Sequence, residues 1–269
     1  DTLKGKLISQ IQSNGRGGSI TGTAGNYNDN GWYQQATLTY KKLGDFDAPD
    51  YVLSNTGSRT YAGNFTLGYH KFEYSASINY AYYNSELGIL RASHIGNVTS
   101  LVRSINSGQP SVINDFTYDI DPPKQAVAHH GLQINAYKRF ENLGKLEVDY
   151  SFQYNNRLEF DVRRGENAGR ASLDLDLQTQ TLAAYLLIDA VDDTEVQLGI
   201  DGLYQVNRPN PATGIRRLIP DYQSQKLGGF ASMNHRLNDQ WLFLMLNRFV
   251  MRYSLFQIKK YKYFVSIWM

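Results

Sequence analysis

The chain contains no cysteine, only seven prolines, and few charges for its 269 residues. The absence of cysteine excludes disulfide frameworks, cysteine-zinc sites and thiol chemistry. The formal net charge is +2, from 27 basic and 25 acidic residues, so strong attraction to nucleic acid is not expected. No run of about 18 apolar residues occurs through Gln240, and a bundle of membrane-spanning helices is therefore not predicted there.

Signatures of common enzymes are also missing. The sequence has no G-x-S-x-G elbow, Walker loop, H-E-x-x-H pair or EF-hand loop. Two carboxylate pairs, Glu147/Asp149 and Asp174/Asp176, have strand spacing, and we expect them to line a polar interior rather than to act in acid–base catalysis. The chain is therefore expected to have no catalytic residues, no cofactor and no resident metal.

Alternation of apolar and polar residues dominates what is present. From Lys145 to Tyr154, even-numbered residues are apolar or aromatic and odd-numbered residues are charged or polar; residues 72–82 follow the same rule except at Ala81. Successive side chains of a strand point to opposite faces, so each segment has one apolar and one polar face. We expect ten antiparallel strands, at residues 3–12, 17–27, 32–42, 61–70, 72–86, 128–140, 145–158, 173–189, 194–207 and 227–236.

The connections alternate between short and long. Short ones, rich in Asn, Asp and Gly, fall at 28–31, 70–71, 141–144, 192–193 and 238–239. Long ones fall at 43–60, 87–127, 159–172 and 208–226. The connection at 13–16 lies at the same end as the long ones but is short. In a meander, alternate connections lie at the same end, so the pattern predicts an all-β transmembrane outer-membrane barrel with long extracellular loops and short periplasmic turns.

The longest connection contains a helical pattern. Val98, Leu101, Val102 and Ile105 follow a helical period, with Asn97 at the position of an N-cap. Gly108 would end the helix. We expect a short amphipathic helix that packs on the loop.

Several stretches with a characteristic spacing resemble TonB-dependent outer-membrane receptors, especially those of Bacteroidetes-type bacteria. They are YKKLGD at 40–45, APDY at 48–51, NTG at 55–57, ELGILRASHIGN at 86–97, AYKRF at 136–140, FDVRRG at 160–165 and GIRRLIPDY at 214–222. The resemblance implies part of a roughly 22-stranded barrel with an N-terminal plug. It also implies import of a scarce nutrient, powered through the TonB complex.

The chain departs from that family pattern. It contains no plug and no TonB box, and its expected strands make up about half of such a barrel. After Trp241 the regular alternation gives way to apolar clumps and a lysine cluster. We interpret residues 1–241 as a partial receptor barrel and residues 242–269 as an aberrant tail from a truncated or frameshifted gene end.

Loop arginines are the main binding candidates, because the guanidinium fork suits anionic chelates. His94, in the longest loop, could in principle ligate haem iron. The substrate-binding candidates are Arg91, His94, Arg163, Arg164, Arg216 and Arg217. Alternatively, these arginines pair with nearby acids or bind lipopolysaccharide phosphates.

The leading functional hypothesis is a fragment of a TonB-dependent transporter that imports a ferric-siderophore-type iron chelate. Its expected partners are the TonB complex, outer-membrane lipid and lipopolysaccharide, and the small-molecule chelate or another nutrient. One alternative is a passive porin or structural outer-membrane barrel. Another is a secreted glycan-binding β protein, in which the apolar faces would pack against each other instead of against lipid.

Overall fold

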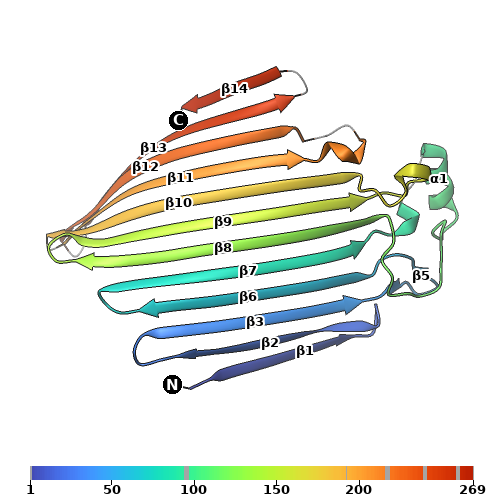
Figure 1. Ribbon diagram of the computed structural model, residues 1–269, viewed down its shortest axis with the longest axis horizontal. Helices are drawn as coiled ribbons and strands as arrows, with labels where there is room; N and C mark the ends of the chain where they lie inside the picture. The colour runs from blue at the N-terminus through green and yellow to red at the C-terminus, as the bar shows by residue number, and fades with distance from the viewer. Residues whose placement is uncertain are drawn as a thin grey trace.

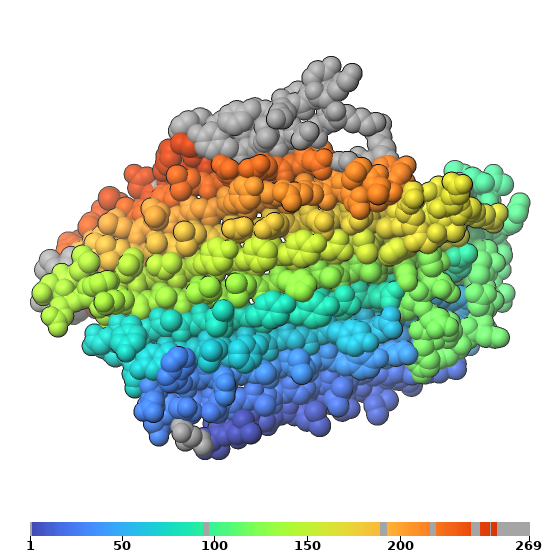
Figure 2. All heavy atoms as spheres, in the orientation of Figure 1, coloured from blue at the N-terminus to red at the C-terminus, as the bar shows by residue number. Residues whose placement is uncertain are grey.

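In the computed structural model, a single antiparallel sheet of twelve strands forms the body of the molecule, and strands adjacent in the sheet follow one another along the chain (Figure 1). The structure describes residues 2–93, 97–191, 193–215, 219–238, 241–258 and 261–268. Figure 2 shows one face of the sheet, with loops gathered over one end. The predicted all-β meander is confirmed.

The sheet contains the ten strands expected from alternation and two more that follow them. Its members are β1 (Lys4–Gln12), β2 (Gly17–Tyr27), β3 (Trp32–Leu43), β6 (Ser58–His70), β7 (Tyr74–Gly88), β8 (Lys124–Phe140), β9 (Gly144–Phe160), β10 (Leu173–Val191), β11 (Thr194–Pro209), β12 (Asp221–Asn238), β13 (Trp241–Ile258) and β14 (Tyr261–Trp268). The last two carry the sheet into residues 242–269. That residues 242–269 come from a truncated or frameshifted gene end stays a prediction.

Smaller elements lie in the connections. They are the hairpin β4 (Phe46–Asp47) and β5 (Val52–Leu53), the helix α1 (Val98–Asn106), and the 3-10 turns η1 (Arg91–Ser93), η2 (Gly165–Asn167) and η3 (Pro211–Thr213). Strands of two residues are too short to show alternation, so the β4–β5 hairpin was not expected. No helix among the described residues is long and apolar enough to cross a membrane.

Long and short connections separate to opposite ends of the sheet, as expected (Figure 1). At the turn end, Gly31 has a φ of 97°, and a Cβ there would lie 2.4 Å from the His70 carbonyl oxygen. Only glycine combines this conformation with so close an approach to the neighbouring turn. Glycine therefore fixes one of the tight turns that set the strand register.

The helix α1 begins where the sequence predicted, since the Asn97 side chain accepts a hydrogen bond of 2.8 Å from the Ser100 amide. Its expected packing on the loop is wrong. The apolar residues Val98, Leu101, Val102 and Ile105 are all exposed, and no residue of the helix is buried. The helical period established the apolar stripe but could not establish what, if anything, covers it.

One face of the sheet is apolar and exposed. A row across the middle strands places Ile78 opposite Ile134, Ile134 opposite Tyr150, and Tyr150 opposite Leu182. Leu182 is 54 % exposed, and Leu38 on the same face is 69 % exposed. Among the described residues no second layer covers this face. Large apolar patches on a protein surface mark contact with another protein or with a membrane.

Aromatic side chains border this apolar face at both ends. Three consecutive strands carry aromatic pairs eight residues apart, Trp32 and Tyr40 on β3, Tyr61 and Tyr69 on β6, and Tyr74 and Tyr82 on β7. Ring centroids of neighbouring strands lie 5.0 Å apart for Trp32 and Tyr69 and 5.0 Å apart for Tyr40 and Tyr61. Eight residues span roughly 20 Å along the axis of a barrel whose strands tilt by about 40°. This is close to the lipid-facing band of an outer-membrane barrel, which is about 25 Å tall.

The opposite face is polar, and its side chains bond to one another across strands. The hydroxyl pairs are Thr21–Thr39 at 2.9 Å, Thr23–Thr37 at 3.1 Å and Ser151–Thr181 at 2.6 Å. Asp149 accepts a hydrogen bond from Asn135 on this face, where Glu147 also lies. Such a face suits contact with water.

The pair Asp174/Asp176 does not line the polar face, so that expectation is wrong. The register places Asp176 opposite Asn156, on the same face as Leu182. Asp176 accepts hydrogen bonds from the Tyr154 hydroxyl at 2.7 Å and from Asn156 at 2.8 Å. β10 is 19 residues long and extends past the aromatic border, where polar groups replace apolar ones on this face too.

Candidate functional site

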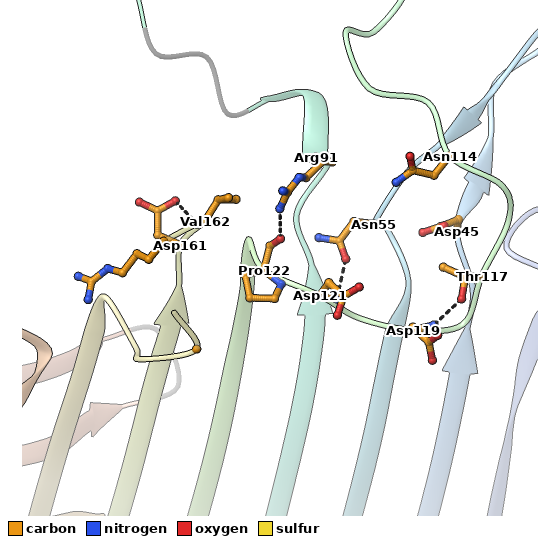
Figure 3. A pocket seen from close by; sticks show the side chains of 12 residues that line it. Asp45, Asn55, Arg91, Asn114, Thr117, Asp119, Asp121, Pro122, Asp161 and Val162 are labelled. Carbon is orange, nitrogen blue, oxygen red and sulfur yellow. Dashed lines mark hydrogen bonds between the residues drawn. The ribbon is translucent and has the colours of Figure 1, made fainter. Parts of the chain in front are cut away.

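A polar pocket lies at the loop end of the sheet, where three long connections meet (Figure 3). Its volume is about 410 Å³. The lining residues are Asp45, Asn55, Arg91, Asn114, Thr117, Asp119, Asp121, Pro122, Asp161, Val162, Arg163 and Gly169. They come from the connections that follow β3, β7 and β9.

The side chain of Asn55 ties two of these connections together. Its Nδ2 donates to the Ile89 carbonyl at 2.9 Å and to the Pro123 carbonyl at 2.8 Å, and its Oδ1 accepts from the Asp121 amide at 2.9 Å. The backbone of Asn55 has a φ of 66°, a left-handed conformation that Asn tolerates better than most residues. One buried amide therefore satisfies three backbone groups in the pocket wall.

Further bonds hold the connection between α1 and β8 over the β4–β5 hairpin. The Asp45 amide donates to the Thr117 carbonyl at 3.0 Å, and the Asn114 amide donates to the Ser54 hydroxyl at 2.7 Å. Ser54 is fully buried. The Tyr118 hydroxyl also donates to the Arg16 carbonyl in the first connection. These bonds fix the position of the pocket wall.

The pocket carries more negative than positive charge. Its lining includes four carboxylates and two guanidinium groups, a formal net charge of −2. Arg91 donates to the Pro122 carbonyl, and Arg163 donates to the Thr213 carbonyl at 3.0 Å. Both arginines are thus held by backbone carbonyls.

Asp45 is the most deeply buried of the carboxylates, with 1 % of its surface exposed. Its Oδ1 accepts a hydrogen bond of 2.8 Å from the Thr56 amide. Its Oδ2 is buried and has no hydrogen-bond partner among the described residues. Figure 3 shows the carboxylate directed toward the side of the pocket that holds Asn55. Buried polar atoms without a partner are uncommon, and this one faces a pocket.

The structure brings together only part of the predicted binding set. Arg91 and Arg163 line the pocket, whereas Arg164 is exposed beside it. His94, Arg216 and Arg217 lie outside the described residues. No group of three or more His, Asp or Glu side chains among the described residues could hold a metal ion.

Sequence reasoning missed Asp45 and Asn55. Both occur in stretches that carry the family resemblance, at 40–45 and 55–57, but nothing in their spacing marks them as buried. Asn55 reaches Pro123, which is 68 positions further along the chain. Only the folded loops reveal that contact.

A charged cluster centred on Glu86 lies outside the pocket. It is on the same face of the sheet as the apolar residues, four positions beyond Tyr82 of the aromatic border. Glu86 accepts hydrogen bonds from Arg59 at 2.7 Å and from Lys124 at 2.6 Å, with 19 % of its side chain exposed. Partial burial acts to raise the pKa of Glu86, and the bonds from Lys124 and Arg59 outweigh it, so the pKa is lowered.

Comparison with known proteins gives fold-level similarity. No protein-family model and no curated protein matches the chain. Among solved structures, the alcaligin outer-membrane receptor FauA of Bordetella pertussis matches with a TM-score of 0.62 and 11% identity, over 98% of this chain and 38% of that chain. The ferripyoverdine receptor of the Pseudomonas aeruginosa outer membrane, bound to ferripyoverdine, matches with a TM-score of 0.63 and 11% identity, over 98% of this chain and 39% of that chain.

A third match, the copper transporter OprC, has a TM-score of 0.60 and 12% identity, over 98% of this chain and 38% of that chain. The chain thus spans about two fifths of the length of the structures it matches. These similarities show that the sheet has the fold of one section of a large outer-membrane β-barrel.

Proposed function

We propose that the chain forms part of the barrel of a TonB-dependent outer-membrane transporter, and that its cargo is a ferric-siderophore-type iron chelate. One observation carries the membrane-barrel part of the proposal. The apolar face lies exposed between two aromatic borders, on the back of a hydrogen-bonded polar face. A sheet of this kind needs lipid on one side and water on the other.

The exposed apolar face argues against a secreted glycan-binding protein. That alternative requires apolar faces to pack against each other, and among the described residues they do not. In the proposed barrel, this face contacts outer-membrane lipid. Polar and charged groups lie beyond the aromatic border at the loop end of the sheet, among them Asp176, Arg59 and Lys124. They would then meet the head groups of the outer leaflet and its lipopolysaccharide.

The iron-chelate cargo is supported by the loop pocket and by the structural neighbours. The neighbours include receptors described with alcaligin and ferripyoverdine. Polar groups that converge in a preformed pocket of about 410 Å³ suit one part of a larger polar ligand. Arg91, Arg163 and the remaining loop candidates would contact that ligand, and the TonB complex would supply energy, as the family resemblance implies.

Uptake of radiolabelled iron by iron-starved cells tests the proposal. Cells that carry the gene should accumulate iron from a panel of ferric siderophores, and cells that lack it should not. Removal of TonB or addition of a proton uncoupler should abolish the difference. Uptake that persists without TonB would contradict the proposal and support a passive porin.

A further inference from the structure

The loop pocket has a chemical preference that neither the proposed transport nor the predicted arginine set assigns. Asp45, Asp119 and Asp121 face it together with Asn55 and neighbouring polar groups. The described lining residues have a formal charge of −2, because their four carboxylates outnumber their two guanidinium groups. A cavity of this charge attracts cations.

Asp45 provides the second and independent observation. Its Oδ1 is held by the Thr56 amide at 2.8 Å, which fixes the carboxylate in place. Within the described part of the chain its Oδ2 is buried without a hydrogen-bond partner, and Asp45 is only 1 % exposed. An unpaired buried acceptor is costly, and a ligand that brings a donor to it removes that cost.

Two cationic partners could fill this role, a metal ion or an organic amine. The described residues contain no group of three His, Asp or Glu side chains arranged to hold a metal. The volume of about 410 Å³ is far larger than a single ion requires. A protonated amine fits better, because it supplies an N–H donor to the Oδ2 atom while the rest of the ligand occupies the cavity.

We propose that this pocket binds a ligand through a protonated primary amine, and that Asp45 receives the amine. The proposal rests on the proposed transport function, to which it adds the class of ligand. The four carboxylates of the described lining outnumber its two guanidinium groups, so the wall as a whole favours a cationic group. A chelate or peptide with a free amine is preferred over the same molecule with a neutral amide.

Matched probes in purified outer-membrane fragments that contain the protein test this preference. The probes are ferrioxamine B, an iron chelate with one terminal amine, and trilysine, each compared with its N-acetylated form. Calorimetry should show that at least one amine form binds roughly 10-fold to 100-fold more tightly than its acetylated partner. Asp45→Asn, which keeps the acceptor for Thr56, should remove that preference.

Asp50→Asn is the matched control, because Asp50 lies exposed in the same connection and does not line the pocket. It should leave the preference intact. If Asp45→Asn fails to fold, as judged by heat-modifiable gel migration, the double variant Asp119→Asn with Asp121→Asn decides. It should reduce the preference by at least about 3-fold, because it removes two charges from the wall.

Three results would overturn the inference. They are equal binding of amine and acetylated forms, no binding of any probe, or a preference that survives the Asp45 or double substitution. The two proposals can fail separately. Equal iron uptake from chelates with a free amine and with an acetylated amine would overturn the amine preference alone. Amine-dependent binding of trilysine without TonB-dependent iron uptake would overturn the proposed iron-chelate cargo alone.

Discussion

Asn55 shows how one side chain can support a whole loop wall. Asn55→Ala would leave the Ile89 carbonyl and the Asp121 amide without this partner. The Pro123 carbonyl would lose one of its two hydrogen bonds, because the Ile89 amide also donates to it. The change would also strain a left-handed backbone. We expect a loss of about 1–3 kcal/mol for each buried group left unpaired. Limited proteolysis should show faster cleavage within residues 109–123, with the barrel still folded.

The control for that change is Asn55→Gly. Glycine accepts the left-handed conformation without strain, so it separates the lost hydrogen bonds from the backbone effect. Cleavage should be nearly as fast as in the alanine variant. Wild-type cleavage rates in the glycine variant would show that the hydrogen bonds contribute little.

Glu86 gives the loop end a dependence on pH. Its pKa is lowered in the folded protein, so its contribution to stability is complete above the unfolded pKa of about 4.3 and is lost as pH falls through the lower folded pKa. Thermal unfolding followed below about pH 5 should show a steeper loss of stability in wild type than in Glu86→Gln. Glu73→Gln, at an exposed residue near the turn end, should behave like wild type; the same slope in wild type and in Glu86→Gln would refute this role.

At the scale of the strand, neighbouring positions on β10 lie on opposite faces of the sheet. Leu182 lies on the apolar face midway between the aromatic borders, and Thr181 bonds to Ser151 on the polar face. Leu182→Arg should cost about 2–4 kcal/mol, the typical penalty for arginine at the bilayer midplane, and Thr181→Arg should cost far less. Urea unfolding in lipid vesicles measures both; equal costs would mean that the face of Leu182 does not meet lipid.

Strands were predictable from the sequence because alternation is a local property that survives in every long strand. The faces were less predictable at the strand ends. In β10, Asp174 and Asp176 alternate with leucines, as residues that face a water-filled barrel interior would. The strand register nevertheless places both on the same face as Leu182, beyond the aromatic border. The pocket was the least predictable part, since Asp45, Asn55 and Pro123 meet only after the loops fold.

The strand β13 departs from the pattern of the others. It places Leu244 and Leu246 opposite Asn234 and Ser232 on the polar face, and Leu246 is 73 % exposed there. We predict that resequencing the gene will reveal a reading-frame shift and restore alternation after Trp241. An unbroken frame that reads as it stands would show that the apolar tail is genuine.

For the whole molecule, composition and fold describe the same design. A mean hydropathy of −0.45 would suit a water-soluble protein. Here one face of the sheet is polar from β1 to β12, and the apolar strand residues gather on the other face between the aromatic borders. In the described part, β1 pairs only with β2 and β14 only with β13, so the sheet is open at both edges. The structurally similar receptors have chains more than twice as long as this one.

Fluorescence quenching by brominated lipids tests most directly whether the apolar face meets the membrane. Tryptophan would be placed at Ile78 on the apolar face or at Asn79 on the polar face, with the native tryptophans changed to phenylalanine. We predict strong quenching for Ile78→Trp, greatest with bromine near the bilayer centre, and little for Asn79→Trp. Equal quenching at both positions, or none at position 78, would contradict a lipid-facing sheet.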